Sequence, residues 1–212
     1  MAHYDLEEQE QIDSIKTWWK MYGNLLTGIV VVASLAVIGW QAWNWYQNTQ
    51  SAKAAAIYSV LEHAASVGDA QKIKAAAGEL AEKFGGTSYA SLGAMLAAKH
   101  SFDAGDLKTA KTQLVWVAEN GKDEIRDLAR LRLAAVQLDE KAYDDALKLL
   151  DASHAQAFDA RFLELKGDVL SAQGKKPEAH IAYKAALEKM TGNQGAAREM
   201  LQQKLDGLGE VA

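Results

Sequence analysis

Cysteine is absent from the 212 residues and proline occurs once, at Pro177. The lack of cysteine excludes disulfides, thiolate metal ligands and cysteine nucleophiles, and it fits a reducing or an oxidising compartment equally well. A single proline leaves long helices uninterrupted, and the abundant alanine and leucine favour helix elsewhere. These features predict an all-α protein.

Charge is absent from the stretch between Met21 and Ala52. Crossing the hydrocarbon core of a bilayer takes about 20 apolar residues in a helix, because every backbone group must pair within the segment. A cleaved signal peptide has a shorter apolar core of about 7–15 residues, and a buried helix of a soluble protein normally has a polar stripe. We therefore expect an uncleaved transmembrane signal anchor over residues 23–46.

Aromatic residues gather at both ends of this stretch, as expected of rings that prefer the headgroup region. The predicted interface belt consists of Trp18, Trp19 and Tyr22 on one side and Trp40, Trp43, Trp45 and Tyr46 on the other. Only one tryptophan, Trp116, lies elsewhere in the chain. The belt supports a helix that spans the bilayer once.

The lysines near the anchor predict its orientation. Lys16 and Lys20 precede it closely, and only Lys53 follows at a comparable distance. Loops rich in Lys and Arg stay in the cytoplasm, and acidic residues count for little in that rule. We therefore assign residues 1–22, an acidic tail, to the cytoplasm and the domain at 47–212 to the other side.

Beyond Lys53 the apolar residues follow a helical period, broken by short turns such as Gly68-Asp69, Gly105-Asp106 and Gly174-Lys175. Small residues recur in register with these turns. Ala110, Ala146 and Ala179 are 36 and 33 residues apart, and Ala98, Ala134 and Gly167 stand twelve residues before them. These spacings bracket the tetratricopeptide period of about 34 residues, so we expect a solenoid of antiparallel helix pairs.

The whole chain also resembles the ancillary subunit family of the SecYEG translocon. The resemblance rests on the acidic tail and on five motifs: Ile15-Lys-Thr-Trp-Trp-Lys20, Ile38-Gly-Trp40, Tyr89-Ala-Ser-Leu92, Leu131-Arg-Leu-Ala134 and Leu165-Lys-Gly-Asp-Val-Leu170. It implies an inner-membrane protein with a periplasmic tetratricopeptide-like domain. The implied partners are the SecYEG channel and a membrane-anchored prolyl-isomerase-like chaperone, and the implied role is assistance to newly translocated proteins. Unfolded translocated proteins are a further candidate partner, bound either directly or only by the chaperone.

Motifs for catalysis or cofactor binding are missing. There is no His-Glu-x-x-His, Gly-x-Ser-x-Gly, Walker loop or dinucleotide glycine pattern, and the five histidines are scattered singly. A formal net charge of −5 argues against nucleic acid as a partner. We therefore expect no catalytic, metal or cofactor site and a protein that is not an enzyme.

In a stack of helix pairs, the first helix of each pair lines the inner surface. Alignment on the recurring alanines places nine residues toward a protein-binding groove: Leu92, Met95, Lys99, Phe102, Leu128, Leu131, Leu138, Arg161 and Glu164. The alternative is that the apolar members only pack between helices. A groove of Met, Phe and Leu with a few charges would suit weak, varied binding to unfolded segments.

The leading hypothesis is a non-enzymatic, membrane-tethered interaction subunit at the translocon. The alternative within the same class is an anchored assembly factor for another envelope biogenesis complex. An enzyme such as a hydrolase would need a convergent polar pocket that the sequence does not indicate.

Overall fold

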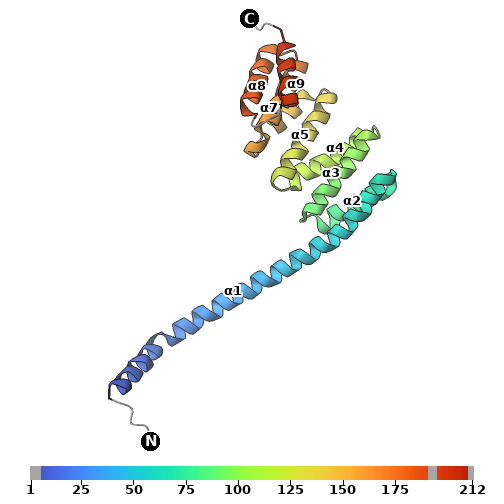
Figure 1. Cartoon of the computed structure of the whole chain (residues 1–212). Helices are drawn as coiled ribbons and strands as arrows, with labels where there is room; N and C mark the ends of the chain where they lie inside the picture. The colour runs from blue at the N-terminus through green and yellow to red at the C-terminus, as the bar shows by residue number, and fades with distance from the viewer. Residues whose placement is uncertain (1–5, 191–194, 210–212) are drawn as a thin grey trace. The chain divides into compact units, whose positions relative to one another are not determined.

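The computed structural model describes residues 6–190 and 195–209, and all regular secondary structure in these ranges is helical (Figure 1). The all-α prediction is confirmed. The chain divides into two compact units, residues 1–50 and 51–212. The first helix, α1, runs from Leu6 to Val67 and so contributes residues to both units.

Within the first unit, α1 contains one stretch that is long and apolar enough to cross a membrane, and none of that stretch is buried. Its few hydroxyl groups bond to the helix's own backbone. Thr27 Oγ1 donates to the Gly23 carbonyl at 2.7 Å, and Ser34 Oγ donates to the Val30 carbonyl at 2.8 Å. The hydroxyls therefore need no water, which suits a helix surrounded by hydrocarbon.

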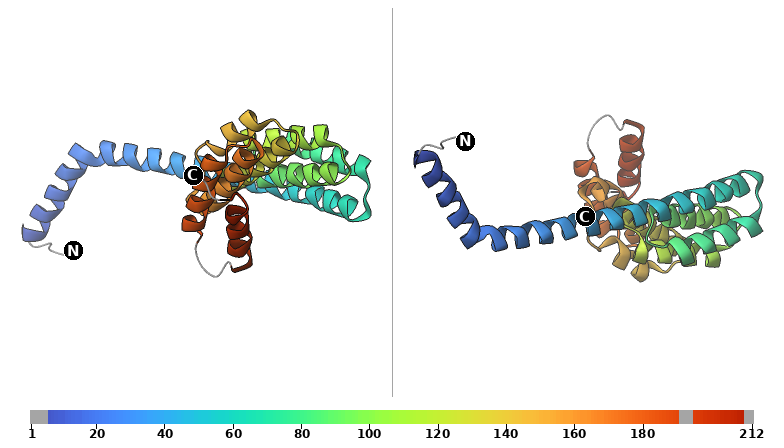
Figure 2. Two further views of the ribbon diagram at one scale, coloured as in Figure 1. Left: turned by 90° about the horizontal axis from the view of Figure 1, so that it is seen from above. Right: turned by 90° about the horizontal axis from the view of Figure 1, so that it is seen from below.

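The second unit consists of the last part of α1 and the short helices that follow it, which lie side by side in consecutive order (Figures 1 and 2). Their bounds are α2 Ala70–Phe84, α3 Ser88–Asp103, α4 Leu107–Asn120, α5 Asp123–Asp139, α6 Tyr143–Leu150, the 3₁₀ turn η1 Gln156–Phe158, α7 Asp159–Ala172, α8 Lys176–Lys189 and α9 Gly195–Asp206. The hairpins α3/α4, α5/α6 and α7/α8 carry the predicted repeats.

Each hairpin turns in the same way. A residue in the left-handed region closes the first helix, with φ of +73° at Gly68, +79° at Gly105, +61° at Lys141 and +77° at Gly174. The next residue donates its N–H back to a carbonyl five positions earlier, as in Ala142 to Gln137 at 2.8 Å and Lys175 to Leu170 at 2.9 Å. This is the Schellman geometry that satisfies the last carbonyls of a helix.

Side chains at the turns then start the following helices. Asp69 accepts from the Lys72 N–H at 3.0 Å, Asp106 from the Thr109 N–H at 3.0 Å and Thr87 from the Ala90 N–H at 3.4 Å. Each bond satisfies an amide that has no partner within its helix. The helix boundaries thus follow from local residue chemistry, as the turn motifs predict.

The recurring small residues lie where paired helices approach closely. Ala110, Ala146 and Ala179 have no exposed surface. A Cβ on Gly167 of α7 would lie 2.4 Å from the Tyr183 ring of α8, so only glycine leaves room for that ring. The spacing seen in the sequence therefore reflects helix packing within the repeats.

The core consists of four apolar clusters, one after another along the domain. Trp116 packs against both of the first two clusters. At the C-terminal end, Leu201 of α9 and Leu208 pack against Tyr183 and Leu187 of α8. Such a succession of neighbouring contacts is how helical repeats share a continuous core, and α9 serves as the terminal cap.

Candidate protein-binding groove

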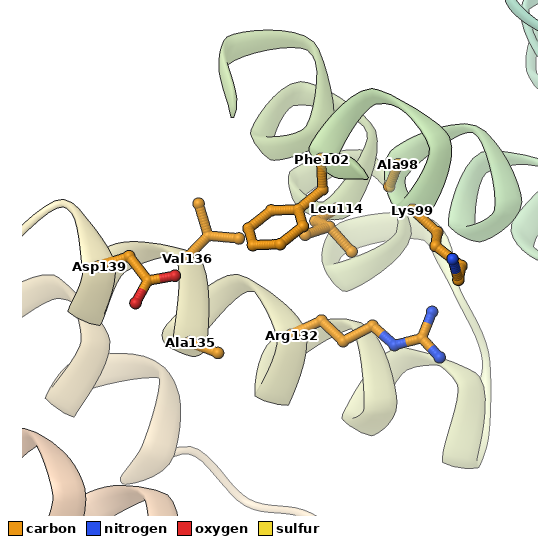
Figure 3. A pocket seen from close by; sticks show the side chains of 8 residues that line it. All are labelled: Ala98, Lys99, Phe102, Leu114, Arg132, Ala135, Val136 and Asp139. Atoms are coloured by element: carbon orange, nitrogen blue, oxygen red, sulfur yellow. The ribbon is translucent and has the colours of Figure 1, made fainter. Parts of the chain in front are cut away.

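A cavity of about 340 Å³ that opens to solvent lies between α3 and α5 (Figure 3). Three helices supply the side chains around it. The lining residues are Ala98, Lys99 and Phe102 from α3, Leu114 from α4, and Arg132, Ala135, Val136 and Asp139 from α5. The cavity joins the first helices of two successive repeats, where the sequence predicts a binding groove.

Charge is distributed unevenly around this cavity. Figure 3 shows Lys99 and Arg132 extending toward one end, Asp139 at the other, and Phe102 and Val136 between them. Lys99 pairs with Asp103 one turn along its own helix. Arg132 is exposed and has no ion-pair partner in the part of the chain that the structure describes. The cavity therefore has an apolar middle, a cationic end and an acidic end.

Of the residues predicted to line the groove, Leu92, Phe102 and Leu128 are the apolar ones that reach solvent, with 38%, 42% and 37% of their surface exposed. Leu128 and Arg132 are one helical turn apart, as are Lys99 and Phe102. Of these residues, Lys99 and Phe102 of α3 and Arg132 of α5 line the cavity, whereas Leu92 and Leu128 are exposed elsewhere on the same two helices.

Three other predicted residues are more deeply buried. Met95 is 5% exposed and packs in the second core cluster with Leu114 and Leu133. Leu131 and Leu138 are partly buried and pack against the cluster that contains Phe162. Their apolar surface is used between helices, so they offer little to a ligand.

Arg161 and Glu164 of α7 lie apart from the cavity, in an ion-pair network with α9. Arg161 pairs with Glu164 at 3.2 Å, and Lys204 of α9 bonds to Glu164 and Asp168, each at 2.9 Å. Burial disfavours the charge on Lys204, but its bonds to the two carboxylates outweigh that effect and raise its pKa. The network fastens α9 to α7.

Tyr183 joins the same network from α8. Its hydroxyl donates to Asp168 at 2.8 Å, and burial, followed by this hydrogen bond, raises the pKa of the phenol. The Tyr183 ring is the one that fills the space beside Gly167. The last repeat is thus held by both ring packing and charge, and Glu164 belongs to this structural network.

Sequence reasoning missed Arg132, Ala135, Val136 and Asp139, which form the α5 wall. The repeat alignment selects equivalent positions on α3 and α5, such as Phe102 and Leu138. A cavity between successive repeats is instead lined by opposite flanks of the two helices, and those flanks are not equivalent. The pattern Leu128, Arg132, Ala135, Asp139 at helical spacing was the signal that could have identified this wall.

The predicted belt residues all lie on the surface of α1, with exposed fractions from 48% at Tyr22 to 71% at Trp45. Two pairs of rings lie close together along the helix: Trp18 with Tyr22 and Trp43 with Tyr46, at centroid distances of 5.8 and 6.3 Å.

Within the described residues, no group of three or more His, Asp or Glu side chains is placed to hold a metal ion.

The repeated hairpins with buried alanines define a helical-repeat protein of the tetratricopeptide type. A family model described as a tetratricopeptide repeat-like domain matches residues 16–210. Full-length relatives then narrow the class: the chain belongs to the family of ancillary SecYEG translocon subunits. No solved structure matches it significantly.

Three curated relatives support that assignment, and each carries the name ancillary SecYEG translocon subunit. The Neisseria gonorrhoeae protein is 36% identical over 96% of this chain and 98% of its own length. The Escherichia coli protein is 30% identical over 95% of this chain and 96% of its own, and the Haemophilus influenzae protein is 29% identical over 97% and 99%.

Proposed function

We propose that this chain is a non-enzymatic, protein-binding subunit of the inner membrane that associates with the SecYEG translocon. The observation that carries the proposal is the similarity to ancillary translocon subunits over nearly the full length of both chains. Residues 1–22 would lie in the cytoplasm, 23–46 would span the membrane, and 47–212 would form the periplasmic domain. The Lys16 and Lys20 bias supports this orientation.

The dimensions of α1 support its role as the anchor. Trp18 and Trp40 are 22 positions apart along α1, which is about 33 Å measured along the helix at its usual rise. That length matches the hydrocarbon thickness of about 30 Å, so both sets of aromatic rings could reach an interface. Tethering beside a channel raises the effective concentration of the second unit there, and weak contacts then suffice.

The periplasmic domain would bind polypeptide. Phe102 at the cavity and the exposed Leu92 and Leu128 on α3 and α5 provide apolar surface in a repeat fold that commonly binds other proteins along its length. The resemblance of the sequence to the ancillary translocon subunit family implies a membrane-anchored prolyl-isomerase-like chaperone as a further partner. It also implies that the protein assists translocated envelope proteins. We propose both for this chain.

Co-purification of the tagged full chain in a mild detergent tests the association. We expect SecYEG channel subunits and a prolyl-isomerase-like membrane protein in the eluate. Recovery of an envelope-assembly machine without channel subunits would favour an assembly factor for another complex and would contradict the proposal. A chain with residues 23–46 replaced by an unrelated transmembrane helix separates recruitment by the anchor from recruitment by the domain.

A second experiment tests the orientation. A reporter fused after Ala212 that is active only in the periplasm should show activity, and a reporter active only in the cytoplasm should show none. The reverse result would contradict the assignment of residues 47–212 to the periplasm.

A further inference from the structure

We infer that the cavity between α3 and α5 recognises a peptide segment that carries one bulky apolar side chain beside a carboxylate. The apolar side chain would enter between Phe102 and Val136, and the carboxylate would meet Arg132 and Lys99. This inference rests on the proposed protein-binding function and specifies the ligand class of that site.

The middle of the cavity is suited to one large side chain. The cavity has a volume of about 340 Å³ and opens to solvent, and Phe102, Leu114 and Val136 supply its apolar surface. Val136 and Leu114 are 4% and 3% exposed and are held by the core, whereas Phe102 is 42% exposed. The site therefore has a rigid floor and one aromatic wall with unused apolar surface.

The cationic end selects the charge of the ligand. Arg132 is exposed and without an ion-pair partner among the described residues, and its guanidinium can bind a carboxylate through two parallel hydrogen bonds. Lys99 lies at the same end, where Asp103 offsets part of its charge (Figure 3). An acidic group at this end gains a contact that the chain itself leaves open.

The acidic end favours a peptide over a fatty anion. Asp139 lines the far end of the cavity, where the tail of an acyl chain would have to lie against an ionised carboxylate. A peptide can present a backbone N–H or a basic side chain there. A segment with an acid on one side of its apolar residue and a donor on the other matches the cavity at both ends.

The test uses the full chain in lipid nanodiscs and synthetic peptides in which phenylalanine is separated from aspartate by zero to three glycines. Matched peptides carry lysine in place of aspartate or serine in place of phenylalanine. Fluorescence anisotropy measures binding with the same dye and linker throughout. We expect the Phe–Asp peptides to bind at least about tenfold more tightly than the Ser–Asp peptides, because only they bury an apolar side chain.

Variants assign the contacts. Arg132→Glu should lower the affinity for the Phe–Asp peptide about fivefold or more, and it should leave the affinity for the Phe–Lys peptide unchanged or raise it. Asp139→Asn should lower the affinity for the Phe–Lys peptide only. Phe102→Ser should lower the affinity for both peptides. Lys184→Gln, on the exposed face of α8, is the control that should change neither affinity. Circular dichroism and urea unfolding show whether each variant is folded.

The inference would be overturned if Arg132→Glu lowered the affinity for the Phe–Asp and Phe–Lys peptides equally, or if Phe102→Ser left the affinity for both unchanged. Complete displacement of the Phe–Asp peptide by an equal concentration of laurate would also overturn it. A change in the oligomeric mass of the detergent-solubilised chain on Arg132→Glu would mean that a second copy occupies the cavity. Co-purification of channel subunits by the same variants is scored separately. Loss of peptide selectivity with retained channel subunits refutes this inference alone, and absence of channel subunits from the native chain refutes the proposed function.

Discussion

At the residue scale, Asp127 of α5 is the most deeply buried carboxylate among the described residues, with 1% of its surface exposed. Its Oδ2 accepts from the Ala155 N–H at 2.9 Å, and Arg130 lies 3.5 Å from its Oδ1. Arg130 also donates to the Ser153 carbonyl at 3.0 Å. These contacts hold the segment that follows α6. Helix α6 has only 8 residues, whereas the corresponding helices α4 and α8 have 14 each.

Replacing this carboxylate should therefore destabilise the domain. Asp127→Ala leaves the Ala155 N–H without its acceptor and Arg130 without its counter-charge, so we expect a loss of about 2–4 kcal/mol in the free energy of unfolding. Urea unfolding of the full chain in detergent, followed by circular dichroism, measures it. Glu119→Ala on the exposed side of α4 is the control, with a change within about 0.5 kcal/mol. A loss no larger than that of the control would contradict the structural role of Asp127.

At the element scale, the turns differ in one residue. Lys141 stands at the position that Gly105 and Gly174 occupy in the other repeats, and its φ of +61° is costly for a residue with a Cβ. Lys141→Gly should raise the free energy of unfolding by up to about 1 kcal/mol, because the relieved strain exceeds the added freedom of the unfolded chain. Lys175→Gly is the matched control, since Lys175 has φ of −83° and has no such strain to lose. Urea unfolding compares the two, and an equal gain in both would contradict this explanation.

Two of the helix caps make stability depend on acid pH. Hydrogen bonds from Lys72 lower the pKa of Asp69, and hydrogen bonds from Thr109 lower the pKa of Asp106. Because each pKa is lower in the folded chain, the ionised caps stabilise the fold above the unfolded pKa of about 3.9, and this stabilisation is lost as pH falls through the folded values.

The double variant Asp69→Asn, Asp106→Asn should therefore lose less stability than the parent between about pH 6 and pH 3. Asparagine still accepts the capping bond but does not titrate. Urea unfolding at both pH values measures the difference, with Glu119→Gln as the control that should behave like the parent. Equal acid losses in parent and double variant would show that these caps do not contribute to the pH dependence.

At the scale of the whole molecule, the aromatic belt predicts where α1 meets the bilayer surfaces. The test uses variants that keep one tryptophan and carry phenylalanine at the other tryptophan positions. Lipids brominated near the headgroup should quench the fluorescence of Trp18 and of Trp43 more than lipids brominated near the chain ends. Trp116 packs between two core clusters and should be quenched by neither. Stronger quenching of Trp18 or Trp43 by the deep label would contradict the belt assignment.

Much of this architecture follows from the sequence. The long uncharged stretch of α1, the left-handed glycines and the Asp and Thr caps each depend on neighbouring residues, so sequence spacing predicts them. The buried alanines follow from repetition, because each repeat packs the same position against the same kind of neighbour.

The lining of the cavity between α3 and α5 could not be predicted from the sequence. Met95 and Leu131 appear suitable for a groove at helical spacing, yet both pack inward, while Arg132 and Asp139 line the cavity. Glu164 is engaged by Lys204, 40 positions away. The helices, their ends and the long apolar stretch of α1 can be predicted from the amino-acid sequence, because they depend on local periods and caps. Which flank of each helix faces its neighbour became clear only from the packed domain, because it depends on how successive pairs rotate against one another.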